Sequence, residues 1–213
     1  MRMTRVPSPV FPVAFYVSTA VIRRYHGRMR LFAAITPPME VTEHLVRALR
    51  PLRGDLRWGD PDNWHITLAF YGEQPEGAVE DLVDHLSVAA RMNEDFTVCL
   101  KGAGSFNNRN LWMGVGGETR QLRNLMADCL LDPEERKRQR AHLTVARPSQ
   151  RMRIRGWDPV IPDLVRALSV YEGPDWHVSE IELISSELGR GRSGGPLHDT
   201  VATLALSSAG RLV

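Results

Sequence analysis

The chain has very few cysteines. Cys99 and Cys129 are the only two in 213 residues, and both lie in apolar stretches. Two such thiols do not form the disulfide framework of a small secreted domain, so we expect them to be reduced and buried. This usage predicts a cytoplasmic protein. The length and the apolar share of 43% predict a soluble chain with a core sufficient for one large domain or two small lobes.

The apolar run at residues 10–22 (VFPVAFYVSTAVI) is too short to cross a bilayer. It resembles a signal peptide, but Pro12 interrupts it, and Arg23 and Arg24 follow it directly, which disfavours export. We therefore expect residues 1–28 to be an N-terminal extension, flexible or arising from a misassigned start, with export as the alternative. Residues 29–213 would then form the folded domain, with no membrane segment.

Acidic residues are missing from two stretches. Residues 1–28 contain five arginines and no acid; without them the chain has 22 basic and 25 acidic residues, a net charge of −3. The folded body is therefore not globally basic, and any affinity for nucleic acid must come from a local patch. Such a patch is the basic run at residues 136–155, which has no acid; it holds Arg136, Lys137, Arg138, Arg140, Arg147, Arg151, Arg153 and Arg155. A run of this kind is usually a solvated face.

Phosphate loops of the Walker type are also missing. The stretch GRGRSG (residues 189–194) matches a dinucleotide-binding glycine pattern, but Pro196 and a second strand follow it instead of a helix. It therefore predicts a glycine-rich hairpin loop.

The remaining pattern alternates between helical and strand periodicity. Helices are predicted at residues 37–53, 76–92, 118–131 and 159–171, and strands at 30–36, 63–72, 95–106, 110–116, 141–148, 176–188 and 199–208. There is no clean interdomain linker and no low-complexity segment.

The strand NWHITLAFYG (residues 63–72) has polar side chains opposite a good apolar face. Alternation predicts the apolar face to consist of Trp64, Ile66, Leu68 and Phe70. His65 and Thr67 then lie together on the other face. A single polar pair of this kind would most simply face solvent.

The stretch AHLTVARP (residues 141–148) repeats the pattern. Leu143 and Val145 are predicted to be apolar-facing, with His142 and Thr144 opposite. If the two strands face each other, two imidazoles lie on either side of a cleft with two hydroxyls between them. This arrangement suits in-line attack on a phosphodiester, because one imidazole can remove a proton from water while the other protonates the leaving oxygen.

A metal site is the competing explanation for paired histidines. Threonine is a poor metal ligand, and no carboxylate or cysteine cluster accompanies either motif. We therefore expect no metal and no cofactor.

HITLAF and HLTVAR resemble the two signature motifs of the two-histidine (2H) phosphoesterase superfamily, and the chain is most similar to its bacterial and archaeal RNA 2′,3′-cyclic phosphodiesterases, also called 2′-5′ RNA ligases. MRLFAAITPP is similar to the opening strand of that family, GAGSFNNRNLWMGV to its central strand pair and EIELISSELG to its final lobe. The resemblance covers about residues 29–208. It implies an α+β, bilobal fold with two pseudo-symmetric lobes of antiparallel strands around a central cleft.

The same resemblance implies site roles. His65 would be the proton donor to the leaving 3′ oxygen and His142 the proton acceptor that activates water. Thr67 and Thr144 would hold the phosphate. Arg147 closes the second motif as in the family, although alternation puts it on the apolar side. Ala141 and His198 stand where the family often has proline and tyrosine.

The expected activity is metal-independent hydrolysis of RNA 2′,3′-cyclic phosphate ends to 2′-phosphomonoesters, with reversible 2′-5′ RNA ligation as a second activity of the same groups. Alternatives are a phosphodiesterase acting on small cyclic nucleotides or ADP-ribose cyclic phosphate, and a non-catalytic RNA-binding protein. The expected partners are RNA ends bearing the cyclic phosphate; we expect a monomer with no obligatory protein partner.

Overall fold

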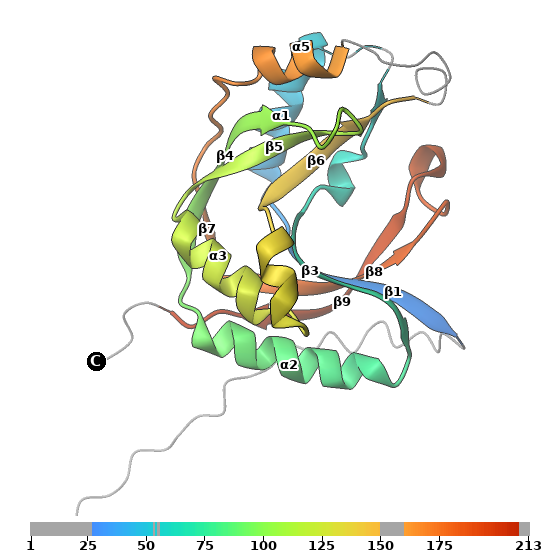
Figure 1. The fold of residues 1–213 in the computed structure, drawn as a ribbon, viewed down its shortest axis with the longest axis vertical. Coiled ribbons are helices and arrows are strands. Elements are labelled where there is room, and N and C mark those ends of the chain that lie inside the picture. The colour runs from blue at the N-terminus through green and yellow to red at the C-terminus, as the bar shows by residue number, and fades with distance from the viewer. Residues whose placement is uncertain (1–26, 53, 55, 150–159, 209–213) are drawn as a thin grey trace, which may run out of the picture.

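The computed structural model describes residues 27–52, 54, 56–149 and 160–208. Nine strands form one antiparallel sheet in the order β7-β4-β5-β6-β3-β1-β8-β9, with β2 paired to β6. The strands are β1 (Arg28–Ile35), β2 (Arg57–Trp58), β3 (Ile66–Pro75), β4 (Phe96–Gly104), β5 (Leu111–Gly117), β6 (His142–Arg147), β7 (Trp176–Val178), β8 (Glu180–Glu187) and β9 (Leu197–Ala205). The sheet curls strongly, so its two halves lie at an angle to each other (Figure 1).

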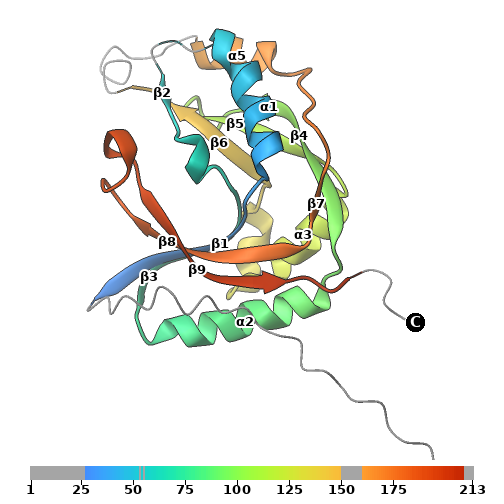
Figure 2. The same cartoon turned by 180° about the vertical axis from the view of Figure 1, so that it is seen from behind.

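Four α-helices are present in the described part of the chain, and the sequence predicts all four. They are α1 (Met39–Leu49), α2 (Ala78–Met92), α3 (Thr119–Asp128) and α5 (Val160–Ala167). Helix α2 packs on β3, β8 and β9, whereas α5 packs on β4 and β5. Figure 2 shows α1 beside α5, on the half of the sheet that contains β4 and β5. Short 3₁₀ helices lie at Arg50–Leu52 (η2), Pro61–Asn63 (η3), Pro133–Arg138 (η4) and Arg192–Gly194 (η5).

The α+β class is confirmed, but the two lobes do not have separate sheets. One half of the sheet contains β7, β4, β5 and β6, and the other contains β3, β1, β8 and β9. The halves join where β3 and β6 pair, and only Ile66 and Leu143 are partners there. The two lobes are therefore two halves of one curled sheet.

The strand predicted at 176–188 is in fact two strands. Trp176–Val178 (β7) pairs with β4 in one half, and Glu180–Glu187 (β8) pairs with β1 in the other. Between them, the carbonyl of Ser179 accepts a hydrogen bond from the Leu206 amide at 2.8 Å. The apolar residues lie at even positions up to Val178 and at odd positions from Ile181, so the alternation changes phase at this break, a signal that the prediction of one strand overlooked.

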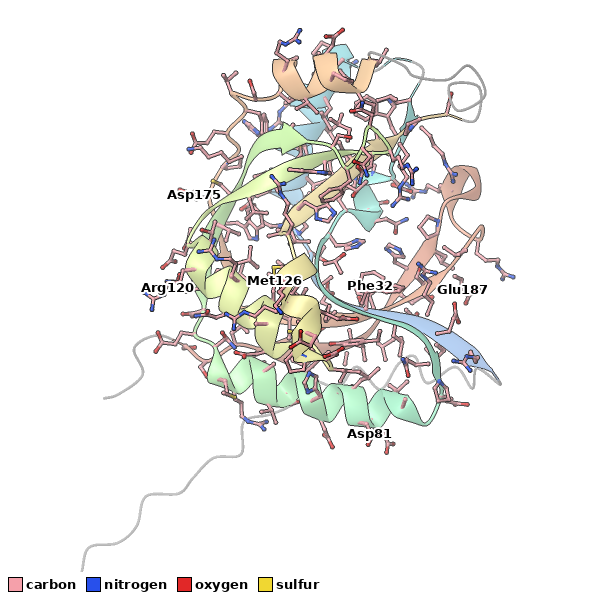
Figure 3. All side chains as sticks on the ribbon, in the orientation of Figure 1. Phe32, Asp81, Arg120, Met126, Asp175 and Glu187 are labelled. Carbon is pink, nitrogen blue, oxygen red and sulfur yellow. The ribbon has the colours of Figure 1, made fainter. Side chains whose placement is uncertain are left out.

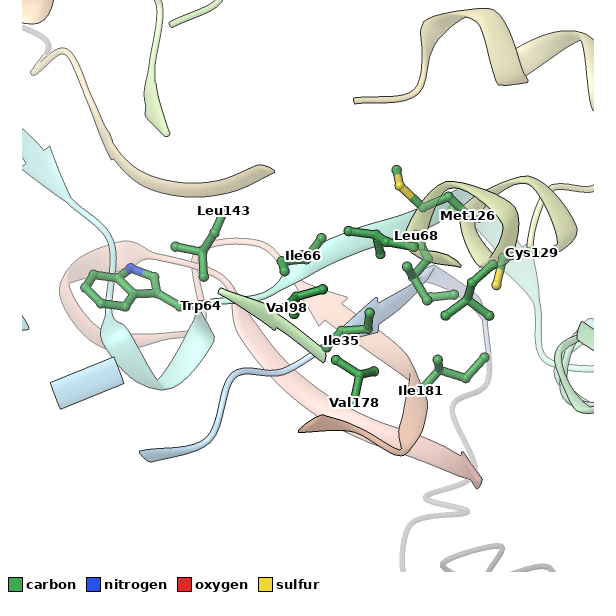
Figure 4. Packing of buried hydrophobic residues seen from close by; sticks show 14 of the residues in the cluster. Ile35, Trp64, Ile66, Leu68, Val98, Met126, Cys129, Leu143, Val178 and Ile181 are labelled. Carbon is green, nitrogen blue, oxygen red and sulfur yellow. The ribbon is translucent and has the colours of Figure 1, made fainter. Parts of the chain in front are cut away.

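The core is one large hydrophobic cluster. It takes side chains from both halves of the sheet and from the helices, among them Ile35, Ile66, Leu68, Val98, Met126, Leu143, Val178 and Ile181 (Figure 4). Cys99 and Cys129 are buried free thiols, as predicted. A second, small cluster of Phe32, Ala34 and Ile184 lies on the opposite face of β1 and β8. Figure 3 shows Phe32 on the side of the sheet away from α2.

Two further predictions concern the ends and loops of the chain. The predicted extension lies outside the described residues except for Gly27 and Arg28, and β1 begins at Arg28, one residue before the predicted boundary. The GRGRSG stretch forms the β8–β9 hairpin loop with η5, as predicted. No helix in the described ranges is long and apolar enough to cross a membrane.

Candidate active site

The two His-x-Thr motifs lie side by side in the sheet. β3 and β6 are neighbouring antiparallel strands joined at Ile66 and Leu143, and both of these side chains are fully buried in the core. The motif histidines and threonines flank this pair in sequence and therefore share the opposite face. The two strands are paired neighbours in one sheet and do not face each other, and the four side chains still gather on one surface.

The two motifs also have matching partners in their outer neighbours. Ile66, Thr67 and Ala69 pair with Ile35, Ala34 and Ala33 of β1, while Leu143, Thr144 and Ala146 pair with Met113, Trp112 and Leu111 of β5. The same register is therefore repeated about the Ile66–Leu143 pair. This match is the local basis of an approximate two-fold relation between the halves.

Each motif contains an extra, unpaired residue at the same position. Leu68 lacks a partner on β1, and Val145 lacks one on β5. These shifts place Leu68 and Ala69, and likewise Val145 and Ala146, consecutively in the core. An insertion of this kind in one strand reverses the faces of the residues that follow it.

The reversal overturns two predictions from strict alternation. Phe70 was predicted to face the core, yet it is 49% exposed. Its ring lies under the Arg30 guanidinium at 4.6 Å. Arg147 was predicted on the apolar side but is exposed as well. Its positive charge lowers the pKa of both His65 and His142, which places it within electrostatic reach of both imidazoles.

A backbone contact fixes the tautomer of each motif histidine. Nδ1 of His65 lies 2.8 Å from the carbonyl oxygen of Asn63, and Nδ1 of His142 lies 2.7 Å from that of Arg140. A carbonyl oxygen only accepts hydrogen bonds, so each Nδ1 carries the proton and donates it. Nε2 is then the nitrogen of each ring that can take up or release a proton during a reaction.

The ring environments of the two histidines differ. The His65 ring centroid lies 4.6 Å from that of Phe32 and 5.3 Å from that of His198. His142 instead contacts Phe106 at 5.0 Å and Trp112 at 5.9 Å. Sequence reasoning missed Phe32, Phe106 and Trp112 as site residues. Phe32 follows Leu31 in its strand, so alternation places its side chain on the face opposite that of a core residue. This was the one available signal that Phe32 faces the site.

All three imidazoles of the site have lowered pKa values. Burial is the main cause at His65 and brings its pKa to about 4; the positive charges of His198, His142 and Arg147 act in the same direction, against the bond to Asn63. Burial also lowers the pKa of His142 and of His198. At neutral pH these imidazoles are therefore neutral without a bound anion, and an anion between them would raise their pKa values again.

The two threonines supply hydroxyls between these rings. Thr67 and Thr144 are half-buried. Within the described residues neither hydroxyl has a protein hydrogen-bond partner, so both can donate to a bound oxyanion. No group of three or more His, Cys, Asp or Glu side chains that could hold a metal ion occurs in the described ranges.

The Gln139 side chain links the segment before the second motif to β3 and α3 by hydrogen bonds. Its amide nitrogen donates to the carbonyl of Leu68, the extra residue of β3, and to that of Met126 at the end of α3, both at 2.8 Å. Gln139 precedes His142 by three residues. The Gln139 side chain therefore adds hydrogen bonds at the junction of β3 and β6, where the two strands have one paired position.

The described part of the basic run divides between η4 and the site. Arg136 and Lys137 are exposed in η4, and Lys137 contacts Glu134 at 3.3 Å. Arg140 is also exposed and lies over the Trp112 ring at 4.6 Å, beside His142. Arg151, Arg153 and Arg155 lie outside the described residues, whereas both motifs lie entirely within them.

Comparison with known proteins gives a consistent result. A family model described as LigT like Phosphoesterase matches residues 35–112, which include the first motif. The chain is 32% identical over 199 residues to an RNA 2′,3′-cyclic phosphodiesterase of Thermus thermophilus, covering 84% of this chain and 90% of the relative. It is 31% identical over 170 residues to the protein of the same name from Archaeoglobus fulgidus, covering 75% and 92%.

Solved structures share the fold. The crystal structure of Escherichia coli LigT complexed with phosphate matches with a TM-score of 0.65 and 23% identity, covering 85% of this chain and 99% of that one. A Thermus thermophilus structure matches with a TM-score of 0.60 and 27% identity, covering 85% and 100%.

Proposed function

Since the chain belongs to the LigT-like phosphoesterase family, we propose that it hydrolyses RNA 2′,3′-cyclic phosphate ends to 2′-phosphomonoesters by two-histidine acid–base catalysis. The observation that carries the proposal is the repeated geometry of the motifs. Each presents an imidazole whose Nδ1 proton is held by a backbone carbonyl, with a threonine hydroxyl beside it on the same face.

The proposed steps give these groups the roles that the resemblance to the family implies. Nε2 of neutral His142 takes a proton from water as it attacks phosphorus. Nε2–H of protonated His65 delivers a proton to the leaving 3′ oxygen, which opens the ring and leaves the phosphate on the 2′ oxygen. Each transfer typically contributes about 10²–10⁴-fold to the rate. A 5′-hydroxyl in place of water would give a 2′-5′ linkage by the same transfers.

The phosphate is held by the groups between the imidazoles. Thr67 and Thr144 donate to its non-bridging oxygens, where charge accumulates in the transition state. Arg147 supplies a positive charge near both imidazoles. A bound phosphate also raises the low pKa of His65, because a negative charge beside the ring favours its protonated form. We therefore expect proton uptake to accompany substrate binding.

The test is product analysis. An RNA oligonucleotide with a 2′,3′-cyclic phosphate end is incubated with the full chain in excess EDTA, and the product ends are identified. We expect a 2′-phosphomonoester, since neither motif offers a plausible metal ligand set. A 3′-phosphate would contradict the assignment of the leaving oxygen. Activity that disappears in EDTA and returns with a divalent ion would overturn the metal-independent mechanism.

A further inference from the structure

A polar pocket opens beside His65 on the half of the sheet that lacks β6. Its lining includes Thr36, Asp62, His65, Glu182, His198 and Thr200. None belongs to the basic run, and two of them are acidic. A pocket for phosphate alone would be lined by cations, so these walls fit another part of the substrate.

Glu182 is the carboxylate of this pocket that two neighbouring hydroxyls hold in a fixed orientation. Asp62 contacts Arg192 at 3.1 Å. Glu182 accepts one hydrogen bond on each oxygen, from the hydroxyls of Thr36 and Thr200, and is half-buried. A carboxylate oxygen can accept two hydrogen bonds, so each oxygen retains one position. The threonines thus hold a planar, two-pronged acceptor in place.

The proposed reaction puts a nucleoside at this pocket. If His65 protonates the 3′ oxygen, the ribose that carries this oxygen, and the base attached to it, lie on the His65 side. Proteins read unpaired RNA bases through their Watson–Crick edges and stack them on rings, including histidine. His198 supplies such a ring in the pocket wall, held against Phe32 at 5.2 Å.

Only guanine carries two adjacent N–H donors on its Watson–Crick edge, N1–H and N2–H. Adenine and cytosine place an acceptor nitrogen beside their amino group, and uracil flanks its single N–H with two carbonyls. We propose that this pocket binds the base of the terminal, cyclic-phosphate-bearing nucleotide, and that Glu182 selects guanine there. The inference rests on the proposed function and adds base specificity to it.

The experiment compares four oligonucleotides that differ only in the base of the nucleotide carrying the 2′,3′-cyclic phosphate. We expect kcat/KM for the guanine end to exceed that for the uracil end by about 10- to 100-fold, as for other paired hydrogen-bond contacts to a base. Glu182→Gln replaces one acceptor by a donor and so matches adenine and cytosine, each of which places an acceptor nitrogen beside its amino group. This variant should lose most of its preference for guanine, and its kcat/KM for adenine and cytosine ends should rise relative to that for guanine.

Glu180→Gln is the matched control, since Glu180 is exposed on the same strand, β8. It should retain the guanine preference. Equal kcat/KM values for all four ends in the unmodified protein would overturn the inference while leaving the proposed function intact. An equal loss of kcat/KM on all four ends in Glu182→Gln would also overturn the inference. Glu182 would then have only a structural role, as the hydrogen-bond partner of Thr36 and Thr200. If no end is opened, the proposed function itself fails, and the inference with it.

Discussion

The two halves of the sheet use the same backbone arrangement around different side chains. Both motifs pair with their outer neighbour in the same register, contain one extra residue at the same position and donate Nδ1–H to the carbonyl two residues earlier. Around His65 lie Phe32, His198 and a polar pocket. Around His142 lie Phe106, which is 38% exposed, Trp112 and the Arg140 guanidinium.

This difference fits the proposed division of the two motifs into an acid and a base. The backbone sets the tautomer and the direction of each ring, so the neighbouring side chains are left to set its proton affinity. The deeper burial of His65 lowers its pKa to about 4 and makes it the imidazole whose protonation depends more strongly on a bound anion. The pKa of His142 is also lowered by burial, which favours the neutral form that the proposed base requires.

The largest expected effect comes from removing either imidazole. His65→Ala and His142→Ala should each lower kcat on a cyclic-phosphate RNA by at least about 10²-fold, because each removes one proton-transfer partner. Both variants should keep the far-UV circular dichroism spectrum of the unmodified protein, since neither ring belongs to the large core cluster. Near-normal turnover in one variant alone would break the comparison, since one half would then suffice for catalysis.

Much of this arrangement is accessible from the sequence. Apolar periodicity identifies all four helices and most strands, and two copies of His-x-Thr identify the centre of the site. Alternation fails where it assumes an unbroken ladder. It cannot reveal the unpaired Leu68 and Val145, and so it misplaces Phe70 and Arg147, which follow them.

Side chains brought in from distant segments are also hidden from local pattern. His198 and Glu182 line the same pocket as His65 because β8 lies beside β1, more than 100 residues away along the chain, and β9 lies beside β8. The β7–β8 break at Ser179 takes the chain from one half of the sheet to the other, and there the apolar residues change from even positions up to Val178 to odd positions from Ile181, a phase shift that marks the break but not the new partner strand. Pairing of this kind is decided by tertiary packing, which strand propensity does not encode.

Arg147 belongs to the second motif but acts on both histidines. Arg147→Met should lower kcat/KM by about 10- to 10²-fold, the range expected for one lost charge-assisted contact to phosphate. It should also raise the pKa values of His65 and His142, because the cation now lowers both. Titration of the histidine Cε1–H signals by NMR measures these shifts. Arg190→Met, in the β8–β9 hairpin beside Glu187, is the control and should change neither quantity.

The difference in burial between the two histidines should appear in the pH dependence of stability. An unfolded histidine titrates near 6.5, above the folded pKa of about 4 at His65, so between these values the unfolded state binds more protons. Stability is therefore lost as the pH falls from about 6.5 to 4, by up to about 1.4 kcal/mol per pH unit for one such group.

The check is thermal unfolding between pH 4 and 7. His65→Gln should flatten the dependence of Tm on pH more than His142→Gln does, since His65 has the more strongly lowered pKa. Equal flattening would show that the two sites are equally buried in solution and would remove the basis for assigning them different roles. Inorganic phosphate should reduce the slope in the unmodified protein, because an anion in the site favours the protonated rings.

The smallest expected effect concerns Arg140, which lies beside His142. Its exposed guanidinium lies over Trp112, beside the site but outside the proposed proton transfers. Arg140→Gln should raise KM for RNA a few-fold, leave kcat nearly constant and reduce the slope of log KM against log salt by about 1, since one phosphate contact releases about one counterion. Arg140→Lys keeps the charge and should keep the salt slope, which separates charge from stacking on the ring. Arg166→Gln, an exposed residue of α5 paired with Asp163, should change nothing. If Arg140→Gln leaves KM and its salt slope unchanged, the basic run is the solvated face that such runs usually are, and binding energy comes from the His65 half instead.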